Sequence, residues 1–267
     1  MRSSAPHILV TNDDGIRAPG LLALKDACAE VGDVTILAPS HNWSASGHVK
    51  TMHKPLRVQE VTLPDGTEAL STSGAPSDAV ALALLGIIDR PVDLVVSGVN
   101  HGANLGHDVT YSGTVTAAME AAISNIPAIA ISLDTREQAN FKPAARFAAA
   151  LARQTLEQGL PEGILLNVNV PPLPADEIVG VQVTRMGLRI YRDELVERVD
   201  PRGKPYYWIG GPAPTGVEQE GTDIWAVANG YISVTPIQLD LTSHDVINSL
   251  KEWQLDRERL FAPDKGE

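Results

Sequence analysis

Two adjacent acidic residues follow the first apolar run of the chain and could together hold a metal ion. Asp13 and Asp14 come shortly after the run at residues 8–10. In a continuing strand their side chains would face opposite ways, but Gly15 lets the chain turn, so both carboxylates can face one cation. A simpler role also fits these residues, namely an Asx turn and a cap for the helix after Pro19.

Two later loops supply neutral oxygen atoms, and each also follows an apolar run. Residues 38–47 contain three serines, and residues 97–106 combine glycines, which permit close backbone approach to a ligand, with asparagines. A serine-rich loop by itself is also typical of solvated surface. Because open α/β sheets bind ligands at the carboxyl ends of their strands, we expect these loops to meet the acidic pair at one edge.

A helix start completes this set of polar groups. Residues 111–114, Tyr-Ser-Gly-Thr, lead directly into a helical pattern at 115–124. Free N–H groups at a helix N-terminus beside two hydroxyls can seat a phosphate, although an ordinary Ser or Thr cap explains the same residues. The convergence of acids, neutral oxygens, glycines and a helix start favours a functional site.

The elements that must position these groups alternate between short β-rich runs and helical patterns. This alternation predicts an α/β fold, a Rossmann-like three-layer sandwich with a mostly parallel sheet. The expected strands are 8–11, 34–37, 94–96, 128–133 and 164–170, and the expected helices are 21–31, 76–88, 114–124 and 141–156. A hairpin of 56–63 and 67–71 around Pro64-Asp65-Gly66 is expected beside the sheet.

The pattern changes after residue 179. Residues 180–231 read as β-like pieces interrupted by Pro and Gly and rich in Tyr and Trp, with too few periodic apolar residues for a core of their own. We therefore divide the chain into a Rossmann-like catalytic domain (1–179), a β-rich oligomerisation arm (180–235) and a C-terminal strand and helix (236–267) that pack on the core or on a partner subunit. The final helix, near 243–253, is expected to dock on the main domain.

Composition narrows the class of protein. The net charge is −12 with scattered Lys and Arg, which argues against a nucleic-acid polymer as partner. Cys28 is the single cysteine, which excludes an intrachain disulfide and a zinc-thiolate cluster and predicts a reducing, cytoplasmic location. No apolar run has the length of a signal-peptide core or a membrane span, so we expect no membrane association.

Several stretches resemble one known family. The runs VTNDDGIRAPGL, APSHNWS, GAPSDAV, SGVNHGANLGHDVTYSGTVTAAMEA and TPIQLDLT are similar to those of the SurE family of metal-dependent 5′/3′-nucleotidases, the stationary-phase survival proteins. The resemblance spans nearly the whole chain, and the long Gly and Asn block is its most specific part.

The resemblance implies roles for individual residues. The implied metal ligands are Asp13, Asp14, Ser44 and Asn100, with Asp13 and Asp14 catalytic. The implied phosphate or substrate pocket is formed by Asn12, Asn104, Ser112, Gly113 and Thr114. The resemblance further implies that the stretch after Gly180 is a hairpin arm for a homodimer or homotetramer. The chain departs from the common family pattern at Ser40-His41, Trp43 and His107, which bears on substrate preference.

The implied ligands are all oxygen atoms, which favours one Mg²⁺ or Mn²⁺ ion over zinc. The expected reaction is hydrolysis of nucleoside 5′-monophosphates, with the 3′ position left open. The ion polarises the phosphoryl oxygens and orients a water, while Asp13 or Asp14 assists proton removal. No phospho-enzyme is expected, because a haloacid-dehalogenase-type site has its second Asp two residues after the first, where this chain has Gly15. Polyphosphate hydrolysis and a non-catalytic nucleotide or metal sensor stay open as alternatives. His41, His101 and His107 are candidates to protonate the leaving group, or else surface or supporting residues.

Overall fold

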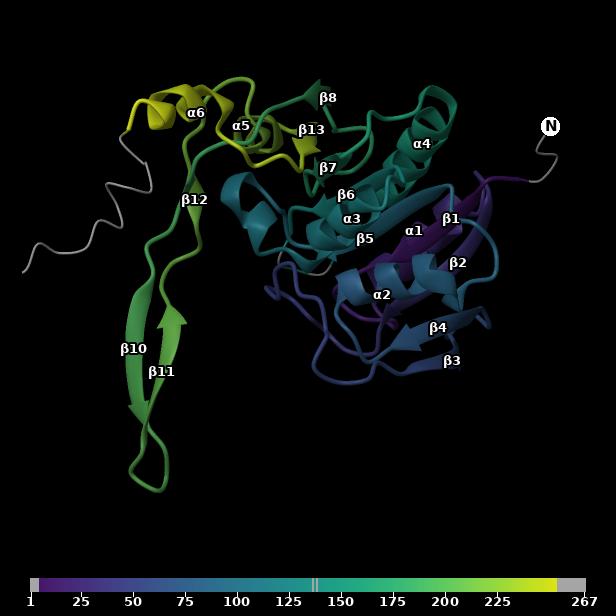
Figure 1. Ribbon diagram of the computed structural model, residues 1–267, viewed down its shortest axis with the longest axis horizontal. Coiled ribbons are helices and arrows are strands. Elements are labelled where there is room, and N and C mark those ends of the chain that lie inside the picture. Colours follow the sequence, from purple (N-terminus) through teal and green to yellow (C-terminus); the bar gives the residue numbers. More distant parts are fainter. Residues whose placement is uncertain (1–4, 136, 138, 254–267) are drawn as a thin grey trace, which may run out of the picture.

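A nine-stranded mixed sheet forms the centre of the protein (Figure 1). The computed structural model describes residues 5–135, 137 and 139–253. The strands of this sheet, in chain order, are β1 (His7–Thr11), β2 (Asp33–Pro39), β3 (Val58–Thr62), β4 (Glu68–Thr72), β5 (Leu94–His101), β6 (Ala128–Leu133), β7 (Ile164–Val170), β8 (Gly180–Val183) and β13 (Tyr231–Gln238). Their order across the sheet is β3-β4-β2-β1-β5-β6-β7-β13-β8. The strands from β4 to β7 in this order are parallel, so their carboxyl ends lie at one edge.

Helices cover both faces of the sheet, which makes the three layers expected from the sequence. On one face α1 (Pro19–Cys28) and α4 (Lys142–Gln158) pack over Ile8 and Val10, and on the other α2 (Pro76–Leu82) and α3 (Gly113–Ile123) pack over Leu9. Because successive strand residues face opposite ways, the apolar run of β1 is buried on both sides. The predicted Rossmann-like α/β fold is confirmed. None of the described helices is both long and apolar enough to cross a bilayer.

Two boundaries differ from the sequence prediction. The helix expected to reach residue 88 ends at Leu82 and continues as one π turn, η1 (Ala83–Ile87), in which Gly86 has a φ of 116° that interrupts the helix. The strand β5 continues through Asn100 to His101, because these residues pair with β6 after a register shift. Asn100 thus lies at the end of a strand, and the loop begins after it.

The predicted hairpin is present at the edge of the sheet. β3 and β4 pair antiparallel from Val58↔Thr72 to Thr62↔Glu68, and β4 also pairs in parallel with β2. The turn between them has Gly66 at a φ of 86°, a conformation that glycine adopts at low cost. The hairpin therefore extends the central sheet.

The segment 180–235 is not a single arm. Its first and last strands, β8 and β13, belong to the central sheet, where β13 lies antiparallel to β7 and parallel to β8. The helix α5 (Asp223–Ala228) packs on β13 and β7. The part that extends from the body is a narrower arm made of β9 (Arg189–Ile190), β10 (Glu194–Val199), β11 (Pro205–Gly210) and β12 (Thr215–Gly216) (Figure 1). Hereafter the arm means residues 189–216.

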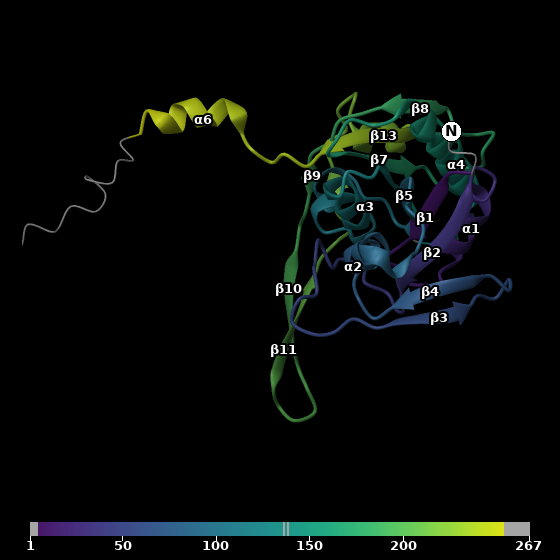
Figure 2. The same cartoon turned by 45° about the vertical axis from the view of Figure 1, so that its right-hand side comes forward.

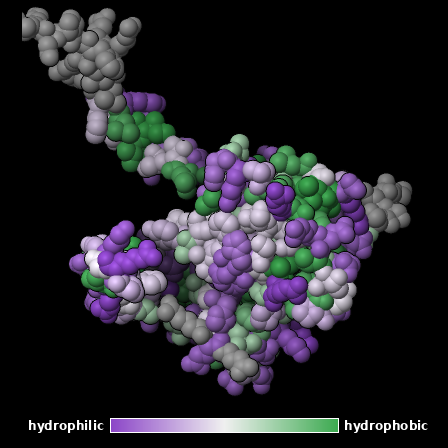
Figure 3. Space-filling model, turned by 90° about the horizontal axis from the view of Figure 1, so that it is seen from below, coloured by the Kyte–Doolittle hydropathy of each residue, from purple (hydrophilic) through white to green (hydrophobic). Residues whose placement is uncertain are grey.

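The last described helix, α6 (His244–Lys251), projects from the body (Figure 2). It buries none of its residues, so the expectation that it docks on the main domain of its own chain is wrong. Val246, Leu250 and the following Trp253 are 46%, 39% and 63% exposed. Hydrophobic side chains are visible on this projecting segment in Figure 3. An amphipathic helix in this position presents an apolar face without a partner surface in the described part of its own chain.

A candidate metal and phosphate site at the carboxyl edge of the sheet

The acidic pair lies in a tight turn after β1. Asn12 holds this turn: its Oδ1 accepts a hydrogen bond from the Gly15 N–H (3.2 Å), and its Nδ2 donates to the Gly15 carbonyl oxygen (3.0 Å). Gly15 has a φ of 101°, as the predicted turn requires. The Asx turn is therefore real, but neither acid caps the next helix, whose N-cap is Ala18 without a side-chain cap. The two carboxylates are left to contact other loops.

Asp13 contacts the start of α3. It is 3% exposed, and its Oδ1 accepts a hydrogen bond of 2.5 Å from the Thr114 hydroxyl. Ser112 is the N-cap of α3, with its Oγ accepting from the Val115 N–H. A Cβ added to Gly113 would lie 2.7 Å from the Cβ of Asp13, so only glycine permits this approach. The acid after β1 and the helix start, a hundred residues later in the chain, therefore form one cluster.

Asp14 contacts the other two predicted loops. Its Oδ2 accepts from the His101 backbone N–H (3.2 Å), and its Oδ1 lies 3.4 Å from the Asn42 Nδ2. The serine loop also reaches Asp13, because the Trp43 N–H donates to the Asp13 carbonyl oxygen (2.7 Å). The three loops predicted to meet at this edge are thus brought together.

Ser44 and Asn100 are next in the chain to residues that contact the acidic pair, Trp43 and His101. Ser44 is exposed, and its backbone N–H donates to the Asn42 Oδ1 (2.7 Å). Asn100 donates from its Nδ2 to the Gly102 carbonyl oxygen (2.8 Å), so its amide nitrogen is already hydrogen-bonded within the protein. Its amide oxygen is the atom that could serve as a ligand.

No Lys or Arg of the described residues forms an ion pair with Asp13 or Asp14. Burial raises the pKa of Asp13 to about 6, the Thr114 hydroxyl bond opposes the rise, and the Asp14 charge adds to it. Burial also raises the pKa of Asp14, against the His101 N–H bond. A divalent cation would reverse both effects by favouring the ionised forms.

The donor set fits a hard cation. In the described chain no group of three or more His, Cys, Asp or Glu side chains could hold a metal ion. A site here must therefore add neutral oxygens to the two carboxylates, and a hydroxyl and an amide oxygen are the kinds of donor that suit Mg²⁺ or Mn²⁺.

Asn104 fixes the Gly and Asn loop on the sheet. Its Nδ2 donates to the Ser132 Oγ (2.8 Å), and its N–H donates to the Asn169 Oδ1 (2.7 Å). Its carbonyl oxygen accepts from the Nδ2 atoms of Asn167 and Asn169. We did not identify Asn167 and Asn169 from the sequence, although two asparagines alternating with apolar residues in a buried strand were a usable signal.

The base of the arm is joined to the helix start. The 3₁₀ helix η2 (Gly106–Thr110) comes just before Ser112. Its Asp108 accepts from the Arg189 Nε (2.8 Å) and the Tyr191 hydroxyl (2.6 Å), both at the base of the arm. The buried Asp223 accepts from the N–H groups of Gly106 (2.8 Å) and Gly187 (2.7 Å). These two acids were also missed, because each acts through partners distant in the sequence.

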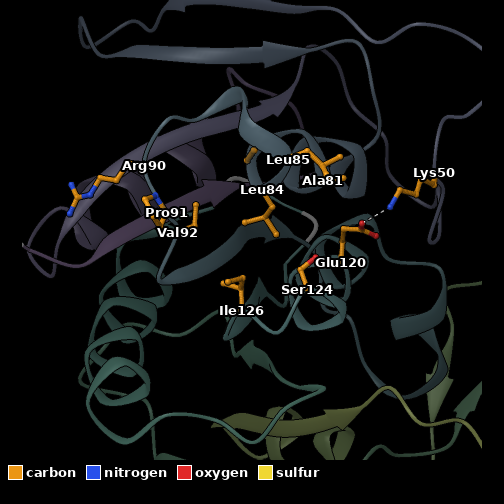
Figure 4. A pocket seen from close by; sticks show the side chains of 11 residues that line it. Lys50, Ala81, Leu84, Leu85, Arg90, Pro91, Val92, Glu120, Ser124 and Ile126 are labelled. Atoms are coloured by element: carbon orange, nitrogen blue, oxygen red, sulfur yellow. Dashed lines mark hydrogen bonds and ion pairs between the residues drawn. The ribbon is translucent and has the colours of Figure 1, made fainter. Parts of the chain in front are cut away.

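Of the hollows on the surface, two lie close to residues that matter for the site or for the loop before it. One, of about 560 Å³, is beside the acidic pair and is lined by Asp14, Ala18, Pro19, Gly20, Asn42, His101, Glu137, Ala139 and Phe141. The other, of about 390 Å³, lies among α2, η1 and α3 (Figure 4). Its lining includes none of the predicted site residues. Of the predicted metal and phosphate residues, Asp14 alone lines the first hollow.

Comparison with known proteins identifies the family. Residues 8–193 match the family model described as survival protein SurE. The chain belongs to the SurE family. A SurE relative from Herpetosiphon aurantiacus, named 5′-nucleotidase SurE, is 53% identical over 91% of this chain and 96% of its own length. One from Geobacter sulfurreducens with the same name is 50% identical over 93% and 94%. A crystal structure of the SurE protein from Aquifex aeolicus matches with a TM-score of 0.78 and 42% identity over 92% of this chain and 98% of that one.

The positions that depart from the common SurE pattern lie around the acidic pair. The His41 and Trp43 rings pack with centroids 5.3 Å apart, on the serine loop. His107 is exposed on η2. The third candidate histidine, His101, contacts Asp14 through its backbone, while its ring Nε2 lies 2.8 Å from the Glu137 carbonyl oxygen. Of the three rings, that of His101 lines the hollow beside Asp14.

Proposed function

We propose that this protein is a divalent-metal-dependent phosphatase that hydrolyses nucleoside 5′-monophosphates to nucleoside and phosphate, with 3′-monophosphates left open as further substrates. The observation that carries the proposal is the acidic pair Asp13 and Asp14, which lies at the start of α3 and forms no ion pair with a Lys or Arg of the described residues. SurE relatives named 5′-nucleotidase at about half identity over most of the chain support the activity and the substrate class.

One metal ion is proposed to be held by oxygen atoms of Asp13, Asp14, Ser44 and Asn100. Hard oxygen donors with two carboxylates suit Mg²⁺ or Mn²⁺. When bound, the ion would supply positive charge to polarise the phosphoryl oxygens and orient the attacking water.

The chain itself would hold the phosphate at the start of α3. The positive end of the helix dipole favours an anion there, and the Thr114 N–H already bonds one anionic group, the Asp13 carboxylate. Ser112 supports this seat as the N-cap. Asn12 and Asn104 are proposed to support the phosphate pocket, because their side-chain bonds to Gly15 and Ser132 hold the two loops in place.

Proton removal from the attacking water falls to one of the two carboxylates. The bond from Thr114 orients Asp13, and the backbone N–H of His101 orients Asp14. Attack by water leaves no covalent phospho-enzyme. A rapid-quench experiment tests this step, and trapping of phosphate on Asp13 would replace it with an aspartyl-phosphate mechanism.

The activity is tested with purified protein, a nucleoside monophosphate and Mn²⁺ or Mg²⁺, by phosphate release with and without chelator. The same assay with the 5′ and 3′ isomers and short polyphosphate ranks the substrates. Release that depends on metal and is abolished in Asp13→Asn supports the proposal. Binding of nucleotide without release would favour the sensor function.

We also propose that the arm forms a homodimer or homotetramer. Tyr206, Tyr207, Trp208 and Ile209 on β11 are 43% to 81% exposed. A two-stranded ribbon is marginally stable alone in water, so exposed apolar side chains on one favour packing against another surface. Light scattering that shows a monomer at micromolar concentration would contradict this assembly.

A further inference from the structure

The segment that follows the serine loop is clamped between α2 and α3. This loop clamp consists of residues 47–51 and the side chains that bind them, Ser77 and Asp78 on α2 and Thr116 and Glu120 on α3. None of these groups belongs to the proposed metal or phosphate set. The clamp begins three residues after Ser44.

Glu120 makes the two ionic contacts of the clamp. Its Oε1 accepts from the Lys50 Nζ (2.8 Å), and its Oε2 lies 3.2 Å from the His48 Nε2. Figure 4 shows Lys50 reaching Glu120 from the loop. Glu120 is 6% exposed, and a buried carboxylate is tolerated only where it is paired. The bond with His48 lowers the pKa of Glu120, with Lys50 acting in the same direction.

Asp78 anchors the end of the clamp. Its Oδ1 accepts from the Thr51 N–H (2.9 Å) and its Oδ2 from the Thr51 hydroxyl (2.7 Å). The Ser77 hydroxyl donates to the Val49 carbonyl oxygen, and the Thr116 hydroxyl donates to the Gly47 carbonyl oxygen. Residues 47–51 are therefore held at several points along α2 and α3.

Ser44 lies between this clamp and a second anchor. On its N-terminal side the Trp43 N–H is bonded to the Asp13 carbonyl oxygen, and on its C-terminal side the Gly47 N–H is bonded to the Tyr111 carbonyl oxygen (2.9 Å). Ala45, between them, has a φ of 58°, in the left-handed region. A three-residue span between two anchors has little freedom, so the position of Ser44 depends on both.

We propose that Glu120 is a positioning residue for metal binding, which holds residues 47–51 against α3 and thereby places the Ser44 hydroxyl at the acidic pair. The inference rests on the proposed function, since it takes Ser44 as a ligand. Residues that orient metal ligands without touching the ion contribute roughly 10- to 100-fold to metal affinity or activity. Glu120→Gln keeps the size of the side chain and removes the charge that holds Lys50 and His48.

The test is a titration of the full-length, substrate-free protein with Mn²⁺, in which the signal of free Mn²⁺ is followed by electron paramagnetic resonance. Glu120→Gln is expected to weaken Mn²⁺ binding about tenfold. Glu157→Gln, an exposed glutamate on α4, is the matched control and is expected to bind as the wild type does. Lys50→Gln changes an exposed side chain of the same pair and is expected to weaken binding to a smaller degree.

A double-mutant cycle with Ser44→Ala separates positioning from a general loss of structure. If Glu120 acts through Ser44, Glu120→Gln causes no further loss of affinity in the Ser44→Ala background. Losses that multiply would overturn the proposal, as would wild-type affinity of Glu120→Gln. Should Glu120→Gln fail to fold, Lys50→Gln in the same cycle decides between these outcomes. Asp13→Asn tests the site itself: wild-type Mn²⁺ affinity in that variant would count against the proposed function and not against Glu120 alone.

Discussion

Asp13 at the carboxyl edge of the sheet is 3% exposed, whereas Trp208 on the arm is 63% exposed. Both exposures are unusual for the residue type, because carboxylates are usually exposed and large aromatic side chains are usually buried. Asp13 is surrounded by groups from its own chain, among them Thr114 and Gly113. The described part of the chain does not cover the ring of Trp208. One region offers oxygen ligands for a cation and the other offers apolar side chains to a protein surface, so the two should respond to different changes.

The largest expected effect is a loss of activity without a change of assembly, on substitution of Asp13. Asp13→Asn should lower phosphate release more than about 100-fold, because loss of a direct ligand exceeds the effect of supporting residues. Light scattering should show the same mass for this variant as for the wild type. A change of assembly in Asp13→Asn would mean that the two regions are not independent.

The reverse experiment changes the arm alone. Trp208→Ser with Ile209→Ser should weaken association by roughly 10- to 100-fold per side chain, the equivalent of about 1.5–3 kcal/mol of lost apolar burial each. Sedimentation velocity over a concentration series measures it, with Glu197→Ser on β10 as the matched control. Mn²⁺ binding should persist in the dissociated protein, because all four proposed ligands come from one chain. Loss of Mn²⁺ binding on dissociation would show that the site depends on assembly through the arm.

The cost of burying Asp13 should be visible in the metal-free protein. Its pKa is about 6 in the folded state against 3.8 for an ordinary aspartate, and this difference corresponds to about 3 kcal/mol. A raised folded-state pKa means that this stability is present below pH 3.8 and lost as the pH rises through about 6. In chelator, the free energy of unfolding of the wild type relative to Asp13→Asn should therefore fall between these pH values. Urea titrations across the range check it, and a flat difference would contradict it.

The smallest expected effect concerns the contact between the base of the arm and Asp108 of η2. Tyr191→Phe removes the hydroxyl that donates to Asp108, next to the start of α3. Because the bond is at a partly exposed position, we expect a loss of about 1 kcal/mol in the free energy of unfolding. Phosphate release should change less than about twofold, since the Arg189 bond to Asp108 remains. A large loss of activity with little loss of stability would show that this contact with the arm controls the geometry of the site.

The sequence by itself determined the local chemistry and the class of fold. Asp13-Asp14-Gly15 after an apolar run, the glycine and asparagine block and the Ser112-Gly113-Thr114 helix start could all be read directly, because turn and cap residues act on their neighbours in the chain. The alternation of apolar runs and helical patterns likewise predicted the parallel sheet and the edge at which ligands bind.

Only the tertiary structure decided which distant groups meet. The bond from Thr114 to Asp13, the clamp of Glu120 on Lys50 and His48, and the insertion of β13 between β7 and β8 join residues far apart in sequence. Periodicity indicates whether a segment is helix or strand and which face is apolar, but strand order and buried polar pairs depend on which surfaces pack together. For the same reason the arm is shorter than the predicted range 180–235. The apolar face of α6 predicted that this helix docks on the main domain, but the helix projects from it.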